Sequence, residues 1–579
     1  MNVQTTGKLG CLLCSVLMVA CFDYEDVAVR EVWNQPIAPS GDASAATVAT
    51  IFSPRAHGNA GHAIANVGDV NGDGYDDILL GDEDYWPPEA DVEGTLNQAC
   101  SATLPSCDIY RLGGAHLLFG SANGISADFS LDDAHATFEG ETGASSAGRI
   151  VSAVGDVNGD GFSDFFIMGN NYPVALAPET DAPFDPPAIW KGTFPDKAYL
   201  FYGRAAGFSG RQTLSSAGTQ ILVVQQYRLL EDVKGIGDIN NDGFADIAIV
   251  VSSVTDYPDN INNTASSVNI FLGKASGLPA TLTPEDADIV ITPDFLASAP
   301  AEYFSRLSVA PVGDVNGDGI SDIAIAHTYL EGYTVDRVTS DVIDVTIIPG
   351  STTLPTGISP VSAVAKWRIS TDGFYYVGQQ ITALGDINND GYDDFALSSD
   401  WSQTGNAVDM LLVPDELRVF MGGDTFLNPP ADALGAISIV DADVTIVVNK
   451  TNANLGGVSI GGAKDVNGDG FDDILVGFPG FDEAKGKVGL FYGNATLGGG
   501  DRITFAQADA SFTGAKVLTR TENTESWDVM DMVGNPLSSA GDFNGDGFDD
   551  MLLGAPSTEW ARAGGTGRVY LIPGGGNPI

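Results

Sequence analysis

The nine-residue stretch DVNGDGYDD, from Asp69 to Asp77, recurs in six further copies along this chain of 579 residues. The other copies begin at Asp156, Asp238, Asp314, Asp386, Asp465 and Asp542, and they read DVNGDGFSD, DINNDGFAD, DVNGDGISD, DINNDGYDD, DVNGDGFDD and DFNGDGFDD. Their starts lie 72 to 87 residues apart. Similarity at a nearly fixed spacing is typical of a repeat architecture, so the sequence predicts seven structural units.

Each copy places oxygen-bearing side chains at positions 1, 3, 5 and 9, and position 7 can add a backbone carbonyl. Position 6 is always glycine, which permits a left-handed turn. A flexible cage of oxygen ligands suits calcium better than magnesium. We therefore predict about seven calcium ions. Their ligands are Asp69, Asn71, Asp73, Tyr75 and Asp77; Asp156, Asn158, Asp160, Phe162 and Asp164; Asp238, Asn240, Asp242, Phe244 and Asp246; Asp314, Asn316, Asp318, Ile320 and Asp322; Asp386, Asn388, Asp390, Tyr392 and Asp394; Asp465, Asn467, Asp469, Phe471 and Asp473; and Asp542, Asn544, Asp546, Phe548 and Asp550.

Two other interpretations of the loops are an EF-hand and an acidic turn that binds nothing. An EF-hand needs an acidic ligand at position 12 and a helix after the loop. Position 12 is apolar in every copy here: Leu80, Ile167, Ile249, Ile325, Leu397, Val476 and Leu553. The runs that follow, such as DILLG and DFFIMG, read as buried strands. Carboxylates held together without a cation would repel one another, so we expect calcium to be part of the fold.

The second unit shows the expected strand pattern. GRIVSAV precedes the loop, DFFIMG and KAYLFYG follow it, and a weaker strand near QTLSS is the fourth. Four short strands in each of seven units predict an all-β, seven-bladed β-propeller. The last unit stops after RVYLIPG, so residues 47–52 are expected to supply the outer strand of the seventh blade and to close the ring.

The charge balance excludes some partners. The chain has 77 acidic against 26 basic residues, a formal charge of −51, and such a surface repels nucleic acid.

The N-terminus predicts export. Lys8 precedes a short apolar stretch, and Leu17 to Cys21 is similar to a bacterial lipobox. We expect a signal peptide at 1–20, a lipidated Cys21 that begins an acidic tether over 21–45, and the propeller over 46–579. The expected location is extracytoplasmic and lipid-anchored, at a bacterial outer membrane, with secretion as the alternative. Cys100 and Cys107 would then form a disulfide or stay as free thiols.

These residues resemble the FG-GAP repeats of the integrin α-chain, a seven-bladed β-propeller, and in particular those of bacterial FG-GAP lipoproteins. Phe119-Gly120 and Gly554-Ala555-Pro556 match the motif plainly. The likeness implies calcium loops between strands 1 and 2 and a ligand face on the opposite side. Integrins carry such loops in only some blades, and this chain lacks their leg domains, so signalling as a heterodimer is not implied.

On that opposite face the 2–3 loops are expected to present aromatic side chains that could clamp a ligand. The candidates are Trp86, Tyr172, Trp190, Tyr257, Tyr329, Trp401, Phe481 and Trp560. The alternative is that these rings have only a structural role, packing the loops against the propeller.

The sequence favours a binding or adhesion module with a protein or glycan ligand at the cell surface, attached to a membrane only through lipid. A structural scaffold of an envelope complex is the alternative, and a propeller-type carbohydrate-active enzyme is less favoured. The five histidines form no clear metal-binding spacing, and no GxSxG motif is present. We therefore expect no enzyme activity and no catalytic residue.

Overall fold

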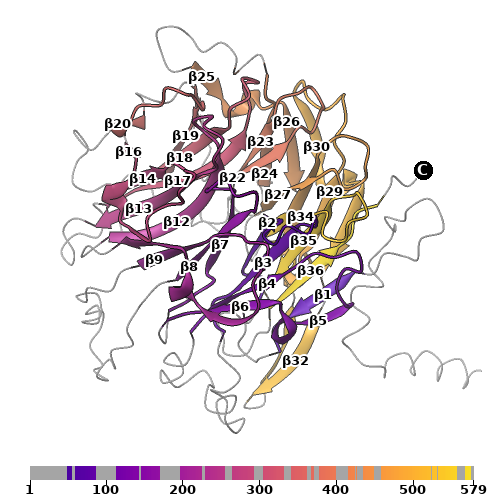
Figure 1. Ribbon diagram of the computed structural model, residues 1–579. Helices are drawn as coiled ribbons and strands as arrows, with labels where there is room; N and C mark the ends of the chain where they lie inside the picture. Colours follow the sequence, from indigo (N-terminus) through magenta and orange to yellow (C-terminus); the bar gives the residue numbers. More distant parts are fainter. Residues whose placement is uncertain are drawn as a thin grey trace, which may run out of the picture.

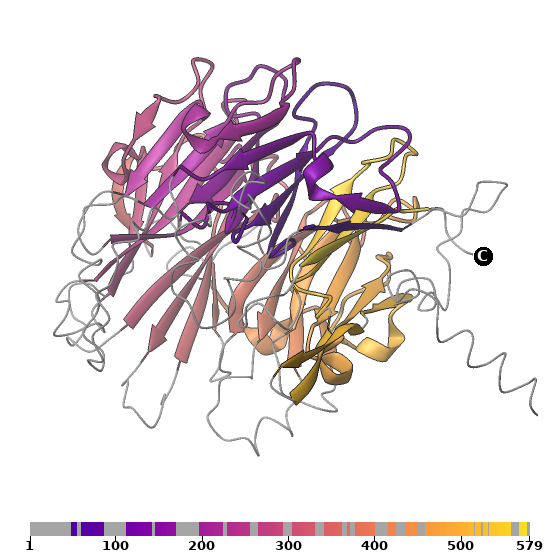
Figure 2. The same ribbon diagram turned by 90° about the horizontal axis from the view of Figure 1, so that it is seen from below.

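The computed structural model describes residues 48–54, 59–85, 112–141, 145–169, 196–223, 228–254, 264–292, 304–330, 341–361, 367–370, 377–399, 415–423, 426, 435–448, 458–514, 516–522, 525–530, 532–556 and 567–575. Their sheets are arranged around a central axis as the blades of a seven-bladed propeller (Figures 1 and 2). The all-β, seven-bladed fold predicted from the sequence is confirmed.

The first strand of each blade lies innermost. It packs against the first strands of both neighbouring blades, and β34 packs against β2, so the circle of inner strands is continuous. These strands are β2 (Ala63–Gly68), β7 (Ile150–Gly155), β12 (Arg228–Gly237), β17 (Phe304–Gly313), β22 (Val377–Gly385), β27 (Ser459–Lys464) and β34 (Leu537–Gly541).

The second strand of each blade begins at the ninth residue of its aspartate loop. These strands are β3 (Asp77–Asp82), β8 (Asp164–Gly169), β13 (Asp246–Val254), β18 (Asp322–Leu330), β23 (Asp394–Ser399), β28 (Asp473–Phe478) and β35 (Asp550–Ala555). After the aspartate, each of them begins with a mostly apolar run, because neighbouring blades cover both of its faces.

The third and fourth strands complete the four-stranded blades. The third strands are β4 (Gly114–Leu118), β9 (Asp196–Phe201), β14 (Thr264–Phe271), β19 (Asp341–Ile348), β24 (Asp415–Phe420), β29 (Lys487–Phe491) and β36 (Arg568–Ile572). The fourth strands are β6 (Ala136–Glu139), β11 (Thr219–Val223), β16 (Ile289–Thr292), β21 (Trp367–Ser370), β26 (Val444–Val448), β31 (Ala510–Thr513) and, for the seventh blade, β1 (Ala49–Phe52).

The strand β1 and its partner β36 come from opposite ends of the described chain. The two run antiparallel, from Ala49 opposite Leu571 to Phe52 opposite Arg568. The side chain of Ile51 is completely buried there. The seventh sheet is therefore built from both ends of the described chain.

A fifth strand lies outside the fourth in six of the blades, and it comes from the 3–4 connection of the following blade. Each of these short strands runs parallel to the fourth strand that it covers. They are β5 (Asp128–Ser130), β10 (Gly210–Thr213), β15 (Thr281–Leu282), β20 (Gly357–Pro360), β25 (Gly435–Ser438) and β30 (Asp501–Thr504).

This arrangement corrects one detail of the sequence prediction. The residues near QTLSS do not form the fourth strand of the second blade. Gln212 and Thr213 belong to β10, which covers the first blade, and Leu214–Ser216 form a 3-10 turn. The fourth strand is β11, which lies further along the chain and which the sequence analysis did not identify.

Three smaller elements lie outside this scheme. The helix α5 (Phe481–Ala484) follows β28, and the strands β32 (Lys516–Glu522) and β33 (Glu525–Met530) form a hairpin after β31.

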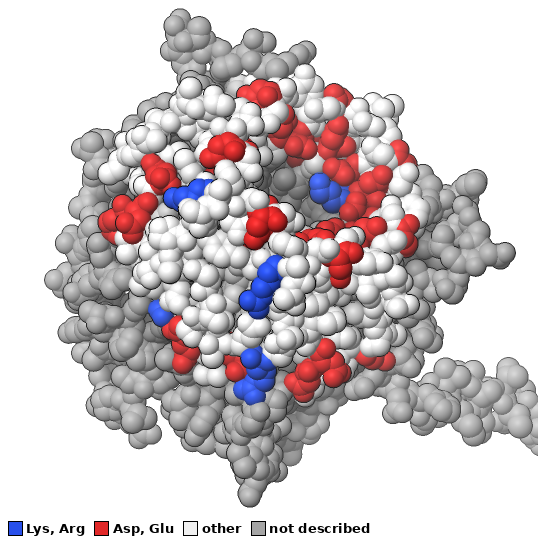
Figure 3. Space-filling view, viewed as in Figure 1, with Lys and Arg blue, Asp and Glu red and all other residues white. Residues whose placement is uncertain are grey.

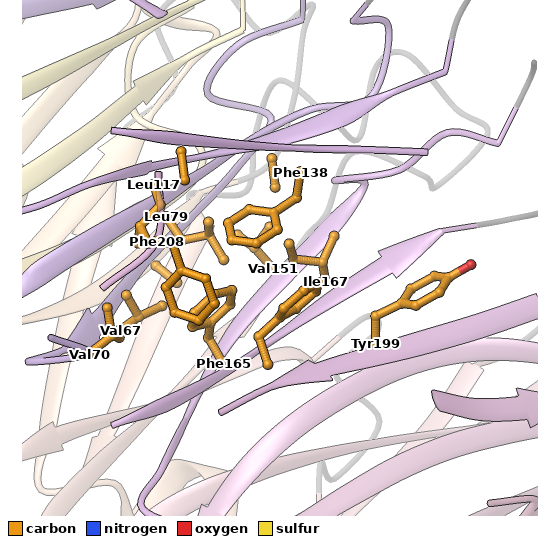
Figure 4. Close-up of a cluster of buried hydrophobic side chains, with 14 of the residues drawn as sticks. Val67, Val70, Leu79, Leu117, Phe138, Val151, Phe165, Ile167, Tyr199 and Phe208 are labelled. Carbon is orange, nitrogen blue, oxygen red and sulfur yellow. The ribbon is translucent and has the colours of Figure 1, made fainter. Parts of the chain in front are cut away.

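The hydrophobic core is a series of clusters between adjacent blades rather than one centre. Between the first two blades, Phe138, Phe165, Phe201 and Phe208 pack with aliphatic residues from both sheets (Figure 4). The rings of Phe138 and Phe201 lie 4.5 Å apart. The blades are therefore stabilised by apolar contacts with each other as well as by their internal pairing.

Candidate functional site

All seven aspartate loops lie between the first and second strands of their blades. Since the four strands of a blade alternate in direction, the seven loops share one face of the propeller and the 2–3 connections share the other. The loops are thus placed as the resemblance implied. On the face seen in Figure 3, acidic groups lie around a central hollow and basic groups are few.

Within each loop the first aspartate organises the backbone. Asp69 Oδ2 accepts a hydrogen bond from Gly74 N–H at 2.8 Å, and Asp69 Oδ1 accepts one from Asp73 N–H at 3.1 Å. Equivalent bonds to the position-6 glycine occur in all seven loops, at 2.7 to 3.0 Å. Aspartate suits this position because its short carboxylate reaches amides of the same turn.

Two positions of the loop, and not only the sixth, have a left-handed backbone. In the first loop φ is +76° at Gly72 and +91° at Gly74. The two loops that read DINND have asparagine at position 4, with φ of +56° at Asn241 and +55° at Asn389. Asparagine is one of the few residues that tolerate this conformation, which explains the variation between glycine and asparagine there.

The ninth aspartate is buried and joins the loop to the third strand. Asp394 is completely buried, and its Oδ2 and Oδ1 accept hydrogen bonds from Ile387 N–H at 3.0 Å and Gly422 N–H at 2.8 Å. In all seven blades the ninth aspartate accepts the N–H of the equivalent glycine. The sequence predicted a metal ligand here but did not predict this second role.

The glycine that donates this bond is the glycine of the Phe-Gly pair quoted above. A Cβ at Gly120 would lie 2.4 Å from the carbonyl oxygen of Asp76, and a Cβ at Gly422 would lie 2.5 Å from that of Asp393. No side chain fits between the third strand and the loop. The Phe-Gly motif is therefore explained by the same contact that buries the ninth aspartate.

Burial strongly affects the ionisation of these carboxyls. Loss of solvent raises the pKa of Asp77, Asp394 and Asp473 to about 8, although the backbone N–H donors oppose that change. The neighbouring loop carboxylates raise the pKa further. A cation beside these groups would favour the ionised form.

The loops offer the donor types that a hard cation requires. Each combines three carboxylates, one amide carbonyl and one backbone carbonyl, and the position-5 aspartates are exposed. In the described residues no group of three or more His, Cys, Asp or Glu side chains has the arrangement of a metal site. In five loops the position-3 amide instead donates to the position-5 carboxylate, as from Asn71 to Asp73 at 3.0 Å. The donor chemistry therefore fits calcium, and calcium binding is taken up as a proposal below.

Neighbouring loops contact one another around the ring. Ser163 N–H donates to the carbonyl of Asp69 at 3.0 Å, and Asp393 N–H donates to that of Asp314 at 3.1 Å. The Asp393 carboxylate also accepts Asp314 N–H at 2.7 Å. A Cβ at Gly72 would lie 2.5 Å from the ring of Phe162 in the next loop. Positions 4, 7 and 8 thus make contacts between blades. The sequence of a single repeat does not reveal these contacts.

The residue just before the loop also has a left-handed backbone. It is glycine in six blades, and in the sixth blade it is Lys464, with φ of +63°. A side chain is unfavourable in this conformation. The Lys464 ammonium lies 3.9 Å from Asp472 Oδ2 and is largely exposed, so this ion pair adds little stability.

We expect Lys464→Gly to stabilise the protein by about 1 kcal/mol, because glycine removes the left-handed strain. Lys464→Ala is the matched control, since it removes the ammonium and keeps the Cβ. Denaturant unfolding would show the gain in the glycine variant alone. Equal effects of the two substitutions would show that charge, and not backbone strain, matters at this position.

We expect Asp394→Ala to lower the free energy of unfolding by about 2 to 4 kcal/mol in calcium-free buffer, because two buried N–H groups lose their acceptor. Asp390→Ala is the control, since Asp390 is exposed and belongs to the same loop. Its effect without calcium should stay within about 0.5 kcal/mol. If the two variants unfolded alike, the structural role of the ninth aspartate would be wrong.

Only two of the eight aromatic candidates lie in the described residues. Tyr329 belongs to β18. Phe481 begins α5, is partly buried and packs against Phe478 with ring centroids 6.0 Å apart. Phe481 therefore fits the packing alternative. Trp86, Tyr172, Trp190, Tyr257, Trp401 and Trp560 lie outside the described residues.

The predicted signal peptide, tether, lipidated Cys21 and disulfide of Cys100 with Cys107 also lie outside the described residues. Among the residues that the structure does describe, none forms a helix with the length and apolar character needed to cross a membrane.

The fold and its loops define a seven-bladed β-propeller with one aspartate loop in every blade. Residues 456–492 and 536–572, in the sixth and seventh blades, match the FG-GAP repeat. The chain therefore carries FG-GAP repeats within a seven-bladed β-propeller.

Similar proteins extend this likeness. The chain is 30% identical to integrin alpha-8 of Gallus gallus over 26% of its length and 29% identical to integrin alpha-IIb of Mus musculus over 31%. It is 32% identical to a phosphatidylinositol-glycan-specific phospholipase D of Dictyostelium discoideum over 19% of its length. The matched part spans 13%, 15% and 12% of these three relatives, respectively.

Proposed function

We propose that the chain is an extracytoplasmic ligand-binding or adhesion module whose calcium loops stabilise the scaffold and whose ligand binds on the opposite face. The difference between the two faces supports this proposal most directly. The seven loops are held by nearly identical hydrogen bonds. The 2–3 connections on the other face differ greatly in extent, from residues 83–113 after β3 to residues 479–486 after β28.

Such a division is typical of binding proteins built on a rigid scaffold. Irregular connections can vary without disturbing the strands, so specificity is usually carried by them. The likeness to integrin α-chains supports a protein ligand, and the aromatic candidates in these connections would also suit a glycan.

The loops themselves are proposed to be structural rather than catalytic. Calcium bound in a loop would be held by the carboxylates at positions 1, 5 and 9, the position-3 amide and the position-7 carbonyl. It would neutralise carboxylates that otherwise repel one another. The ninth aspartate would keep its hydrogen bonds to the third strand, so each ion would help hold three strands of its blade together. Lipid anchoring through Cys21 would place this module on a membrane surface.

We expect simultaneous substitution of Trp86, Trp401 and Trp560 by alanine to weaken binding at least about tenfold, because large aromatic side chains dominate interface energies. Binding would be measured on glycan and peptide arrays and in a cell-adhesion assay, always with calcium present. Tm should not change. The control removes exposed apolar groups elsewhere, with Ile358→Ala and Val440→Ala on the outer rim.

A loss of Tm that matches the loss of binding would favour the packing alternative for these aromatic residues. Retained binding with an unchanged Tm would place the ligand elsewhere. Binding that disappears only in chelator does not decide the question, because chelation is expected to unfold the blades.

A further inference from the structure

The sixth blade differs from the other six at its outer edge. Its sheet contains β27, β28, β29 and β31 and ends there. In every other blade a short parallel strand from the following blade covers the fourth strand. No strand among the described residues pairs with the outer edge of β31.

The covered blades show which backbone groups are used at this edge. Thr50 N–H in β1 donates to the carbonyl of Ala127 at 2.7 Å, and Gln220 N–H in β11 donates to that of Ala280 at 3.0 Å. The residue in the same register of β31 is Ser511, which pairs with Gly489 as Gln220 pairs with Tyr199. An exposed strand edge of this kind is a template for another strand.

The repeat geometry indicates where the missing strand should come from. The covering strands begin eight to ten residues before the fourth strand of their own blade, and nine residues before it in three blades: Gly210 before Thr219, Gly435 before Val444 and Asp501 before Ala510. The strand that covers the sixth blade must come from the seventh blade, whose fourth strand is β1. Nine residues before Ala49 is residue 40.

The entry of the chain into β1 is consistent with this position. Val48, the first described residue, packs against the cluster that contains Phe512 and Ala510 of β31. Val48 thus lies at the junction of the sixth and seventh blades, to which β31 also contributes.

The charges between a covering strand and the blade that it covers also support this assignment. In two covered blades an ion pair crosses it, between Arg211 and Glu139 and between Arg502 and Glu416. In the sixth blade the third strand begins with Lys487, whose ammonium lies 5.4 and 5.6 Å from the ring centroids of Phe481 and Phe505. Residues 22–47 carry five acidic residues and one arginine, so they complement this lysine.

We propose that residues 40–43, in the acidic segment before β1, bind along the outer edge of β31 as a short parallel strand. The sixth blade then has five strands like the others. This docking is independent of the proposed ligand face and of calcium. It fixes the start of the propeller to the rim of its sixth blade.

Hydrogen exchange of the Ser511 amide tests the proposal in the chain from residue 22, with calcium present. We expect Ser511 to exchange as slowly as Gln220, whose amide is covered in the second blade. Ser40→Pro removes the N–H that the first residue of a covering strand donates, as Gly210 N–H does to the His135 carbonyl at 2.9 Å. This variant should speed Ser511 exchange at least about tenfold and leave Gln220 unchanged, whereas Ser40→Ala should change neither.

Three results would overturn the proposal. The first is fast exchange of Ser511 in the intact chain. The second is protection that persists when residues 22–45 are deleted, which would assign the edge to another part of the chain. The third is protection that rises with protein concentration, which would assign the edge to a second copy.

Discussion

Removal of calcium is expected to lower Tm steeply. At a free calcium concentration 100 times the Kd of a site, binding at that site adds about 2.7 kcal/mol of stability. This chain has seven such loops. Their contributions need not add, because each loop contacts the next through backbone hydrogen bonds. Differential scanning calorimetry of protein treated with a chelating resin, with and without added calcium, measures the effect. Magnesium at the same concentration is the control and should restore much less.

The pH dependence sharpens this test. In calcium-free protein, burial raises the pKa of Asp77 and Asp473 to about 8, from 3.8 for the ordinary group. The protonated carboxyl therefore favours the folded state. That contribution is fully present below about pH 4 and is lost as the pH rises through about 8.

Calcium-free protein should thus be more stable near pH 5 than near pH 8. Calcium binding requires ionised carboxylates, so calcium should raise Tm more near pH 8 than near pH 5. A melting curve that does not respond to calcium at either pH would contradict the calcium assignment. A calcium effect of equal size at both pH values would contradict the role given to the buried aspartates.

Deletion of residues 46–53 is expected to give an open, aggregation-prone protein. The deletion removes β1, and so exposes the edge of β36 and removes the parallel partner of β5. The buried Ile51 side chain alone accounts for about 1.5 to 3 kcal/mol. The larger effect is the open sheet edge, which invites pairing with other chains. Size-exclusion chromatography with light scattering measures the outcome.

Deletion of residues 22–38 is the matched control, because it keeps β1 and should leave a monomer. Ile51→Asp should reproduce much of the damage without shortening the chain. If the protein without residues 46–53 stayed monomeric with an unchanged Tm, β1 would not be the element that holds the ring closed.

The repeat made the fold predictable from the sequence. Seven loops with apolar runs on both sides define seven blades, and each second strand begins at Asp77 or its equivalent. The fifth strands were not predictable in this way. Segments such as Gly210–Thr213 are short and mostly exposed, and they pair only because the neighbouring blade presents an edge.

The candidate site was predictable only in part. The acidic residues of the loop are obvious in the sequence, but their different structural roles are not. Asp390 and Asp394 look equivalent in DINNDGYDD, yet Asp390 is exposed and Asp394 is buried against a third strand 28 residues further on. The contacts of Gly72 with Phe162 also join different units, so they emerge only when the blades are assembled.

The pairing of β1 with β36 has a mechanical consequence for a protein attached through its N-terminal end. A pull transmitted along the chain before Val48 would first peel the proposed strand at residues 40–43 from β31 and would then reach β1, which is held between β36 and β5. The hydrogen bonds of β1 to both neighbours would then share the load. Detachment of β1 would leave β36, the last strand of the described chain, without its outer partner. The force at which an attached molecule fails would then be set by four residues at the rim rather than by the calcium loops.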